Sequence, residues 1–220
     1  MKRLEAHMIR PIKTFMEDGL GLSMIAEEFS AGYGRADLVG AYLSDENHFF
    51  RKENGLKGVT IDNYRLVETL MALRLDVNVS YEQLLRKVGV AESTLQKSIL
   101  PRLVNLGLVE HNRGKSARLL YSLPSPADHI VAVEAKQARW RDAILQARRY
   151  TFFADYTYIA VWNGKARLVD KSLLYRHRLG LIGVEVNSAE ILIEAPKRNP
   201  RIPQMNRYCA EFLYSLWLQA

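Results

Sequence analysis

The segment His129-Ile130-Val131-Ala132-Val133-Glu134-Ala135-Lys136 sets the first expectation about the fold. Its apolar and largely β-branched run is typical of a buried strand, and the run ends in two charged residues. Side chains two positions apart on a strand point to the same face. We therefore expect Glu134 and Lys136 to lie side by side, at the end of a strand that belongs to the core of a sheet.

Helical and strand patterns alternate on both sides of this segment, which predicts one α/β core. A polar stretch at 44–56 is expected to be a connecting loop. This core is assigned to residues 1–56 and 124–220. Its predicted strands are 24–30 and 35–43, which form a hairpin around a turn at 31–34, then 129–136, 156–162, 182–186 and 191–195, and its predicted helices are 5–18, 138–153, 170–179 and 204–218.

Residues 57–123 have a different pattern and interrupt the core. Three helical segments are predicted, at 62–73, 81–88 and 92–106, and two short strands follow around a basic turn at 111–115. Helix, helix, turn, helix and a two-stranded wing is the pattern of a winged helix-turn-helix. Pro101 is unusual within the third helix and predicts a kink or a break there.

The overall composition favours an anionic partner. The chain has 220 residues, a net charge of +7 and an isoelectric point near 9.5, as expected for a protein that binds nucleic acid or an acidic surface. Cys209 is the only cysteine, so no internal disulfide and no cysteine-rich zinc site is expected. With no long apolar run and no secretion signal, we expect a cytoplasmic protein without a membrane partner. Whether it forms a homodimer or a larger complex stays open.

Two carboxylates are candidates for a metal site. Asp37, on the second predicted strand, and Glu134 could bind Mg²⁺ or Mn²⁺ together with a backbone carbonyl such as that of Ala135, because hard cations prefer oxygen ligands. Such an ion would polarise a phosphodiester. Lys136 could orient or deprotonate the attacking water, or stabilise the charge that develops on the phosphate.

Three motifs in order resemble those of a known superfamily. They are Gly34-x-x-Asp37, Glu134-x-Lys136 and Gln146-x-x-x-Tyr150, which lie on strand, strand and following helix. The set resembles the PD-(D/E)XK nucleases, and the last motif resembles the RecB-like branch. The resemblance implies a restriction-endonuclease-like mixed sheet flanked by helices. It also implies that Asp37 and Glu134 bind metal, that Lys136 is catalytic, and that Gln146 and Tyr150 position substrate.

Members of this superfamily often add an upstream glutamate, for which Glu17, Glu27 and Glu28 are the candidates. Because neighbouring strand residues point to opposite faces, at most one of Glu27 and Glu28 is expected to face the site. The 97 positions between Asp37 and Glu134 exceed the short connection that is usual in the superfamily, and the insert accounts for most of the excess.

The insert and the helix after Lys136 also supply candidate DNA contacts. Residues 57–123 contain 10 lysines and arginines against 6 acidic residues. Polar side chains off the apolar stripe of the third helix suit groove contacts, and basic residues of the wing suit phosphates. The predicted DNA-binding residues are Ser93, Thr94, Gln96, Lys97, Arg102, Arg113, Lys115 and Arg118 in the insert, with Arg139 and Arg149 on the helix at 138–153.

These observations predict a magnesium-dependent deoxyribonuclease that uses the winged helix to bind double-stranded DNA. Two alternatives remain: a non-catalytic DNA-binding or regulatory protein on a degenerate nuclease fold, and an RNA-directed nuclease. At the level of residues, Glu134 and Lys136 could be solvated charges at a strand end, and Tyr150 could be a core tyrosine. The winged helix could instead mediate protein contacts.

Overall fold

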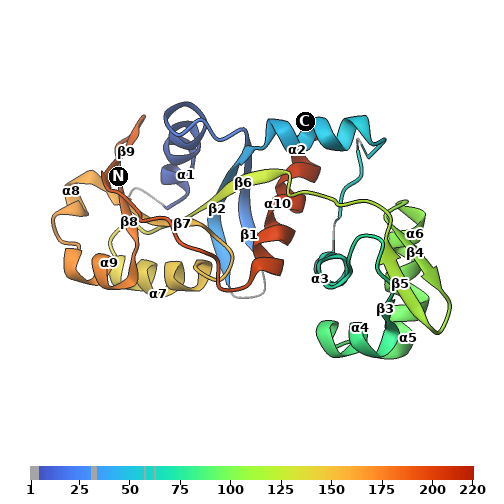
Figure 1. The fold of residues 1–220 in the computed structure, drawn as a ribbon. Helices are drawn as coiled ribbons and strands as arrows, with labels where there is room; N and C mark the ends of the chain where they lie inside the picture. Colours follow the sequence, from blue (N-terminus) through green and yellow to red (C-terminus); the bar gives the residue numbers. More distant parts are fainter. Residues whose placement is uncertain (1–4, 31–33, 57, 62) are drawn as a thin grey trace. The chain divides into compact units, whose positions relative to one another are not determined.

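The computed structural model describes residues 5–30, 34–56, 58–61 and 63–220. It divides the chain into two compact units (Figure 1). The first unit comprises Met1–Ser44 with Pro126–Ala220, and the second comprises Asp45–Ser125. The second unit thus begins at Asp45 and not near residue 57.

A six-stranded mixed sheet forms the centre of the first unit, as expected from the alternating pattern. The strand order is β1-β2-β6-β7-β8-β9; the pairs β6–β7 and β7–β8 are parallel and the other neighbours are antiparallel. The parallel strands are apolar because helices cover both faces of the sheet. The strands are β1 (Met24–Ser30), β2 (Arg35–Leu43), β6 (Ala127–Ala135), β7 (Tyr156–Trp162), β8 (Gly180–Val184) and β9 (Ala189–Ile193).

Helices pack on both faces of this sheet. Met8, Ile12 and Met16, from α1 and the π-helical turn η1, are fully buried against one face, together with Val131 and Val133 of β6. Alternate residues of β6 point to the other face, where α7 packs against β6 and β7 and α10 packs against β1, β2 and β6. The helices and helical turns are α1 (Ala6–Thr14), η1 (Phe15–Gly19), α7 (Trp140–Tyr150), α8 (Asn163–Ala166), α9 (Lys171–His177) and α10 (Pro203–Trp217).

The second unit combines helices with a small sheet of order β3-β5-β4. Helix α4 begins with a capping box, in which the Ser80 side chain accepts from the Gln83 amide and the Gln83 side chain accepts from the Ser80 amide. The elements are α2 (Asp45–Glu53), α3 (Tyr64–Ala72), β3 (Val79–Ser80), α4 (Tyr81–Val88), α5 (Glu92–Thr94), η2 (Leu95–Ile99), α6 (Leu100–Asn105), β4 (Val109–Asn112) and β5 (Ser116–Leu119).

The prediction of a loop at 44–56 is wrong, because Asp45–Glu53 forms helix α2. Acidic residues in its first turn and basic residues in its last turn interact favourably with the helix dipole and stabilise the helix. A polar sequence therefore does not exclude a helix. Its Arg51 is fully buried and donates to the carbonyl oxygens of Val59 (3.4 Å) and Pro124 (2.8 Å). These bonds tie the two ends of the second unit together.

The irregularity predicted at Pro101 takes the form of a π-turn. Proline has no backbone N–H, and its ring crowds the carbonyl four residues earlier. The wider turn Leu95–Ile99 lies directly before it, and the Leu100 amide donates to the Leu95 carbonyl. Two predicted features, the hairpin turn at 31–33 and a helix start at Asp62, lie outside the described residues.

Candidate active site at the ends of β2 and β6

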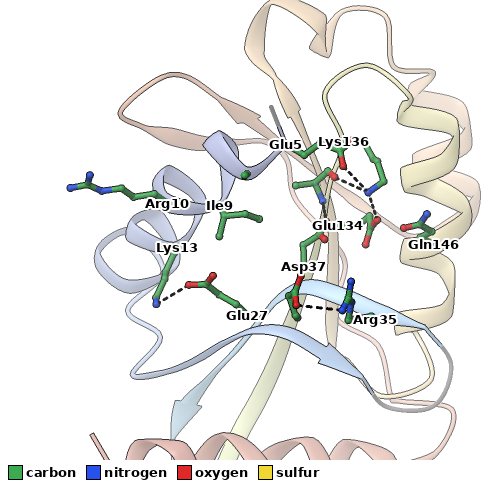
Figure 2. A pocket seen from close by; sticks show the side chains of 13 residues that line it. Glu5, Ile9, Arg10, Lys13, Glu27, Arg35, Asp37, Glu134, Lys136 and Gln146 are labelled. Atoms are coloured by element: carbon green, nitrogen blue, oxygen red, sulfur yellow. Dashed lines mark hydrogen bonds and ion pairs between the residues drawn. The ribbon is translucent and has the colours of Figure 1, made fainter. Parts of the chain in front are cut away.

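An open pocket of about 940 Å³ lies between α1, the β1–β2 pair and the end of β6 (Figure 2). Charged residues dominate its lining, so it suits a polar or charged ligand better than an apolar one. The lining residues are Glu5, Ala6, Ile9, Arg10, Lys13, Glu27, Glu28, Arg35, Asp37, Glu134, Ala135, Lys136 and Gln146. We call it the strand-end pocket.

Strand pairing brings the two predicted carboxylates together. Leu38 pairs with Val133, so Asp37 and Glu134 occupy the next position of the same antiparallel ladder. The Ala135 amide donates to Asp37 Oδ2 over 2.7 Å, which fixes the aspartate at the end of β6. Two carboxylates from different strands thus line one pocket together with Ala135.

Lys136 lies beside Glu134, as the strand geometry predicts. Lys136 Nζ is 2.9 Å from Glu134 Oε1 and 3.1 Å from the carbonyl oxygen of Ala135. The Lys136 amide donates to the Ala160 carbonyl, which holds the segment after β6 against β7. The side chain of Glu134 is 1% exposed and that of Lys136 is 10% exposed, so this is a buried ion pair and not a pair of solvated charges.

Tyr150 reaches the same carboxylate from α7. Ala143, Ile144, Ala147 and Tyr150 are the buried stripe of α7, and the two alanines let the helix approach the sheet closely. The Tyr150 hydroxyl is hydrogen-bonded to Glu134 Oε2 and lies 2.7 Å from the Arg35 carbonyl oxygen. Tyr150 is therefore both a core tyrosine and a contact of the site.

Gly34 allows the chain to enter β2 beneath this tyrosine. Its φ of +119° is in the region that glycine adopts without strain. A side chain here would also lie 3.5 Å from Arg149 and 3.8 Å from the Tyr150 ring. The backbone conformation and the close neighbours therefore explain why a glycine stands at this position of the first motif.

Burial is the main influence on the charge of these groups. Desolvation raises the pKa of Asp37, although the Ala135 amide and Lys136 act to lower it. Desolvation likewise raises the pKa of Glu134 against the hydrogen bonds from Tyr150 and Lys136, and the charge of Asp37 adds to the rise. For Lys136, burial acts to lower the pKa, but Glu134, Asp37 and Glu5 outweigh it and the pKa is raised. The pocket is therefore a desolvated cluster of like and opposite charges.

The upstream glutamates are arranged differently from the prediction. Glu17 lies on η1, is exposed and is not among the residues that line the pocket. Glu27 and Glu28 both line it, so the expectation that at most one faces the site is wrong. The physical reason is the left-handed backbone of Glu28, with φ of +56°, which breaks the alternation of the strand.

Glu5 is an acidic residue of this pocket that the sequence analysis did not select. Its Oε2 lies 3.5 Å from Lys136 Nζ. Three cations of the pocket were also missed, and two of them pair with the glutamates: Lys13 with Glu27 at 3.1 Å and Arg35 with Glu28 at 3.4 Å. The third is Arg10. The sequence contained one signal for these cations: Lys13 is four residues after Ile9, so the two side chains lie on the same face of the predicted first helix.

The helix α7 divides its predicted contacts between two places. Gln146 lines the strand-end pocket, whereas Arg149 lines a second pocket on the same unit. Arg139 lines neither and pairs with Asp142 at 3.3 Å. Arg149 also lies close to Gly34, beside Tyr150, and the DNA contacts of both arginines stay predictions.

Part of the predicted DNA-binding set of the second unit shares one groove. Gln96, Lys97 and Arg113 line a cavity of about 390 Å³ between the third helical segment and the β4–β5 pair. Gln96 also donates to Glu92 over 2.6 Å. Arg118 donates to Glu110 through hydrogen bonds of 3.0 and 2.7 Å. Outside this groove are Ser93, Thr94, Arg102, Lys115 and Arg118.

Two features are absent from the described part of the chain. It contains no group of three or more His, Cys, Asp or Glu side chains arranged to hold a metal ion. Among its helices, none has the length and apolar character needed to cross a bilayer.

No family model matches the chain, and no curated protein matches it. One solved structure is similar, that of SPO1766 from Silicibacter pomeroyi, described as a protein of unknown function. Its sequence is 14% identical and its TM-score is 0.47, with 98% of this chain and 87% of that chain covered.

Proposed function

We propose that the chain is a metal-dependent DNA nuclease of the PD-(D/E)XK type, and that its second unit is a winged-helix module that binds duplex DNA. One observation carries the proposal: Asp37, Glu134 and Lys136 line the same pocket at the ends of neighbouring strands. The Gln146 and Tyr150 pair adds support, since both side chains reach this site from α7.

The residues present fit a hard divalent cation. Asp37 and Glu134 are two desolvated carboxylates, and the charge of Asp37 disfavours the charge of Glu134. The Ala135 carbonyl, which accepts from Lys136 Nζ over 3.1 Å, would be the third oxygen. A cation between them would offset both the desolvation and the repulsion. Mg²⁺ or Mn²⁺ would supply charge stabilisation at a phosphate and a more acidic bound water.

The protein's own residues would then position the substrate. Lys136 is held by Glu134 and stays protonated, so it suits stabilisation of charge on a phosphate better than removal of a proton. Arg10, Lys13 and Arg35 line the pocket and would attract the neighbouring phosphates. Tyr150, on α7, would hold Glu134 in its orientation through the hydrogen bond to Oε2.

The second unit supports a role in duplex binding. Its helices and three-stranded sheet contain the exposed residues Lys97 and Arg113 on one groove. In a winged helix, the third helix enters the major groove and the wing contacts the backbone. Binding by this unit and cutting by the first would be separable functions.

A substrate panel tests the proposal. The purified chain is incubated with labelled linear, circular and single-stranded DNA and with RNA, with Mg²⁺, with Mn²⁺ and with EDTA. We expect cutting of DNA that requires the metal and is lost in Glu134→Gln. Cutting of RNA alone would select the RNA-directed nuclease.

One observation favours the non-catalytic alternative. In the described residues, no third acidic or histidine ligand is grouped with Asp37 and Glu134. A degenerate nuclease site that has lost its activity would have this arrangement. Under that alternative, duplex DNA binds equally well with EDTA and with Mg²⁺, and no substrate is cut.

A further inference from the structure

A second pocket of the first unit has no role in the proposed chemistry. It encloses about 470 Å³ and is bordered by α7, the end of α9 and the segment that follows β9. Six arginines line it: Arg148, Arg149, Arg176, Arg178, Arg198 and Arg201. We call it the arginine pocket.

No carboxylate lines this pocket. Within the described residues, none of its six arginines forms an ion pair with an aspartate or glutamate. The positive charges also act on one another: burial lowers the pKa of Arg198, and the charges of Arg178 and Arg201 add to the effect. Burial and the neighbouring Arg148 and Arg176 similarly lower the pKa of His177.

Helix ends explain only part of this arrangement. Arg148, Arg149 and Arg176 lie in the last turns of α7 and α9, where cations stabilise the helix dipole. Arg198 and Arg201 come from the segment after β9 and have no such reason to lie here. A cluster of six arginines drawn from three segments, with no acidic residue among the lining residues, favours an anionic ligand.

Arg198 is half-buried, whereas the other five arginines of the pocket are exposed. Its Nη2 donates to the His177 carbonyl oxygen over 3.0 Å and also to the Arg178 carbonyl oxygen. Its Nε is buried and has no hydrogen-bond partner within the described residues. A buried N–H donor without an acceptor is rare, and it is the kind of group that a bound oxygen ligand satisfies.

The chemistry of the pocket identifies the ligand class. Arginine forks match the oxygens of phosphate, and several of them converging suit a group with two negative charges. Phe152, with Arg201 5.5 Å from its ring centre, adds an aromatic surface at the same place. Aromatic rings beside arginines are typical surfaces for nucleotides.

We propose that the arginine pocket binds a phosphate monoester, either at the end of a nucleic-acid strand or as a free phosphate or nucleotide. The site does not depend on cutting at the strand-end pocket, so it can be tested in EDTA.

The test compares binding of fluorescein-labelled oligothymidylates with a 5′-phosphate, a 3′-phosphate or neither, and binding of inorganic phosphate by calorimetry. The variant is Arg148→Gln/Arg176→Gln, which changes two exposed side chains. The matched control, Lys165→Gln/Arg167→Gln, removes the same charge from exposed positions outside both pockets. Melting temperatures verify that both fold.

We expect the pocket variant to bind the phosphate-bearing ligand at least about tenfold more weakly than the wild type, because hydrogen bonds between charged groups are removed. We expect the affinity of the control variant to change little. Tighter binding of one phosphorylated end identifies a strand terminus as the source. Binding of inorganic phosphate without an end preference identifies a free ligand. If neither is bound, or if the pocket variant and the control behave alike, the proposal is overturned. A lack of nuclease activity would leave each of these results unchanged.

Discussion

The Ala135 amide donates to Asp37 Oδ2 over 2.7 Å, although the two residues are 98 positions apart in the chain. This bond fastens the end of β2 to the end of β6, and it holds one carboxylate beside the Glu134–Lys136 pair. The whole second unit lies between these residues in sequence. The candidate site is therefore a product of strand pairing, and the insert leaves that pairing intact.

Replacing one carboxylate should weaken metal binding. We expect Asp37→Asn to lower Mn²⁺ affinity at least about tenfold, because a charged oxygen ligand becomes a neutral one. Calorimetric titration measures this directly. The exposed Glu17→Gln serves as control, and equal affinities in all three proteins would contradict the metal site.

The same substitution should change the pH dependence of stability. Asp37 has a raised pKa in the folded protein, so the stability linked to its proton is present below the usual aspartate pKa of about 4 and is lost as pH rises through the folded value. In EDTA, the melting temperature of Asp37→Asn relative to the wild type should therefore increase as pH rises above that range. If the melting-temperature difference between Asp37→Asn and the wild type stays constant or shrinks as pH rises, burial does not disfavour the charge of Asp37.

Tyr150→Phe removes one hydroxyl from a buried position. Glu134 loses a hydrogen bond, and so does the Arg35 carbonyl when the hydroxyl is directed to it. We expect the free energy of unfolding to fall by about 1–3 kcal/mol, measured by urea denaturation. Unchanged stability together with unchanged activity would show that the tyrosine only fills space.

Glu5 should matter more than Glu17, one of the three upstream glutamates that the sequence left as candidates. Its carboxylate is 3.5 Å from Lys136 Nζ, whereas Glu17 is exposed outside the pocket. We expect Glu5→Gln to reduce the cutting rate about tenfold and Glu17→Gln to leave it unchanged. A larger loss of cutting rate in Glu17→Gln than in Glu5→Gln would contradict this ranking.

The second unit should contribute a salt-dependent part of DNA binding. Neutralising Arg113 and Lys115 should weaken duplex binding and flatten the slope of log affinity against log salt by about 1.8, at roughly 0.9 per phosphate contact. Fluorescence anisotropy at several salt concentrations gives the slope. Arg74→Gln/Arg86→Gln is the control, since it removes the same charge from exposed positions of this unit that lie outside the groove and the predicted set. A slope that does not change in the double variant would remove the wing from the interface.

Strand periodicity and the order of the motifs predicted the sheet and the residues that line its end. Local patterns suffice here, because Glu134 and Lys136 are two apart on one strand and Gln146 and Tyr150 are four apart on one helix. Helix α2 was missed because its polar residues resemble a loop, and the buried Arg51 has no signal in sequence.

Glu5 and the arginine pocket could not be predicted for a different reason. Each depends on tertiary contacts between segments that lie far apart in the chain: α1 with the end of β6, and α7 with the residues after β9. The facing of Glu27 and Glu28 depends on a single left-handed residue, which strand alternation does not anticipate.

The most direct test of the central claim is the rate at which the chain cuts linear duplex DNA in Mg²⁺, compared between the wild type, Lys136→Ala and the exposed control Lys165→Ala. We predict metal-dependent cutting by the wild type and the control, and a loss of about a hundredfold or more in Lys136→Ala. Cutting that persists undiminished in Lys136→Ala, or duplex binding without cutting by any of the three proteins, would contradict a nuclease site at the ends of β2 and β6.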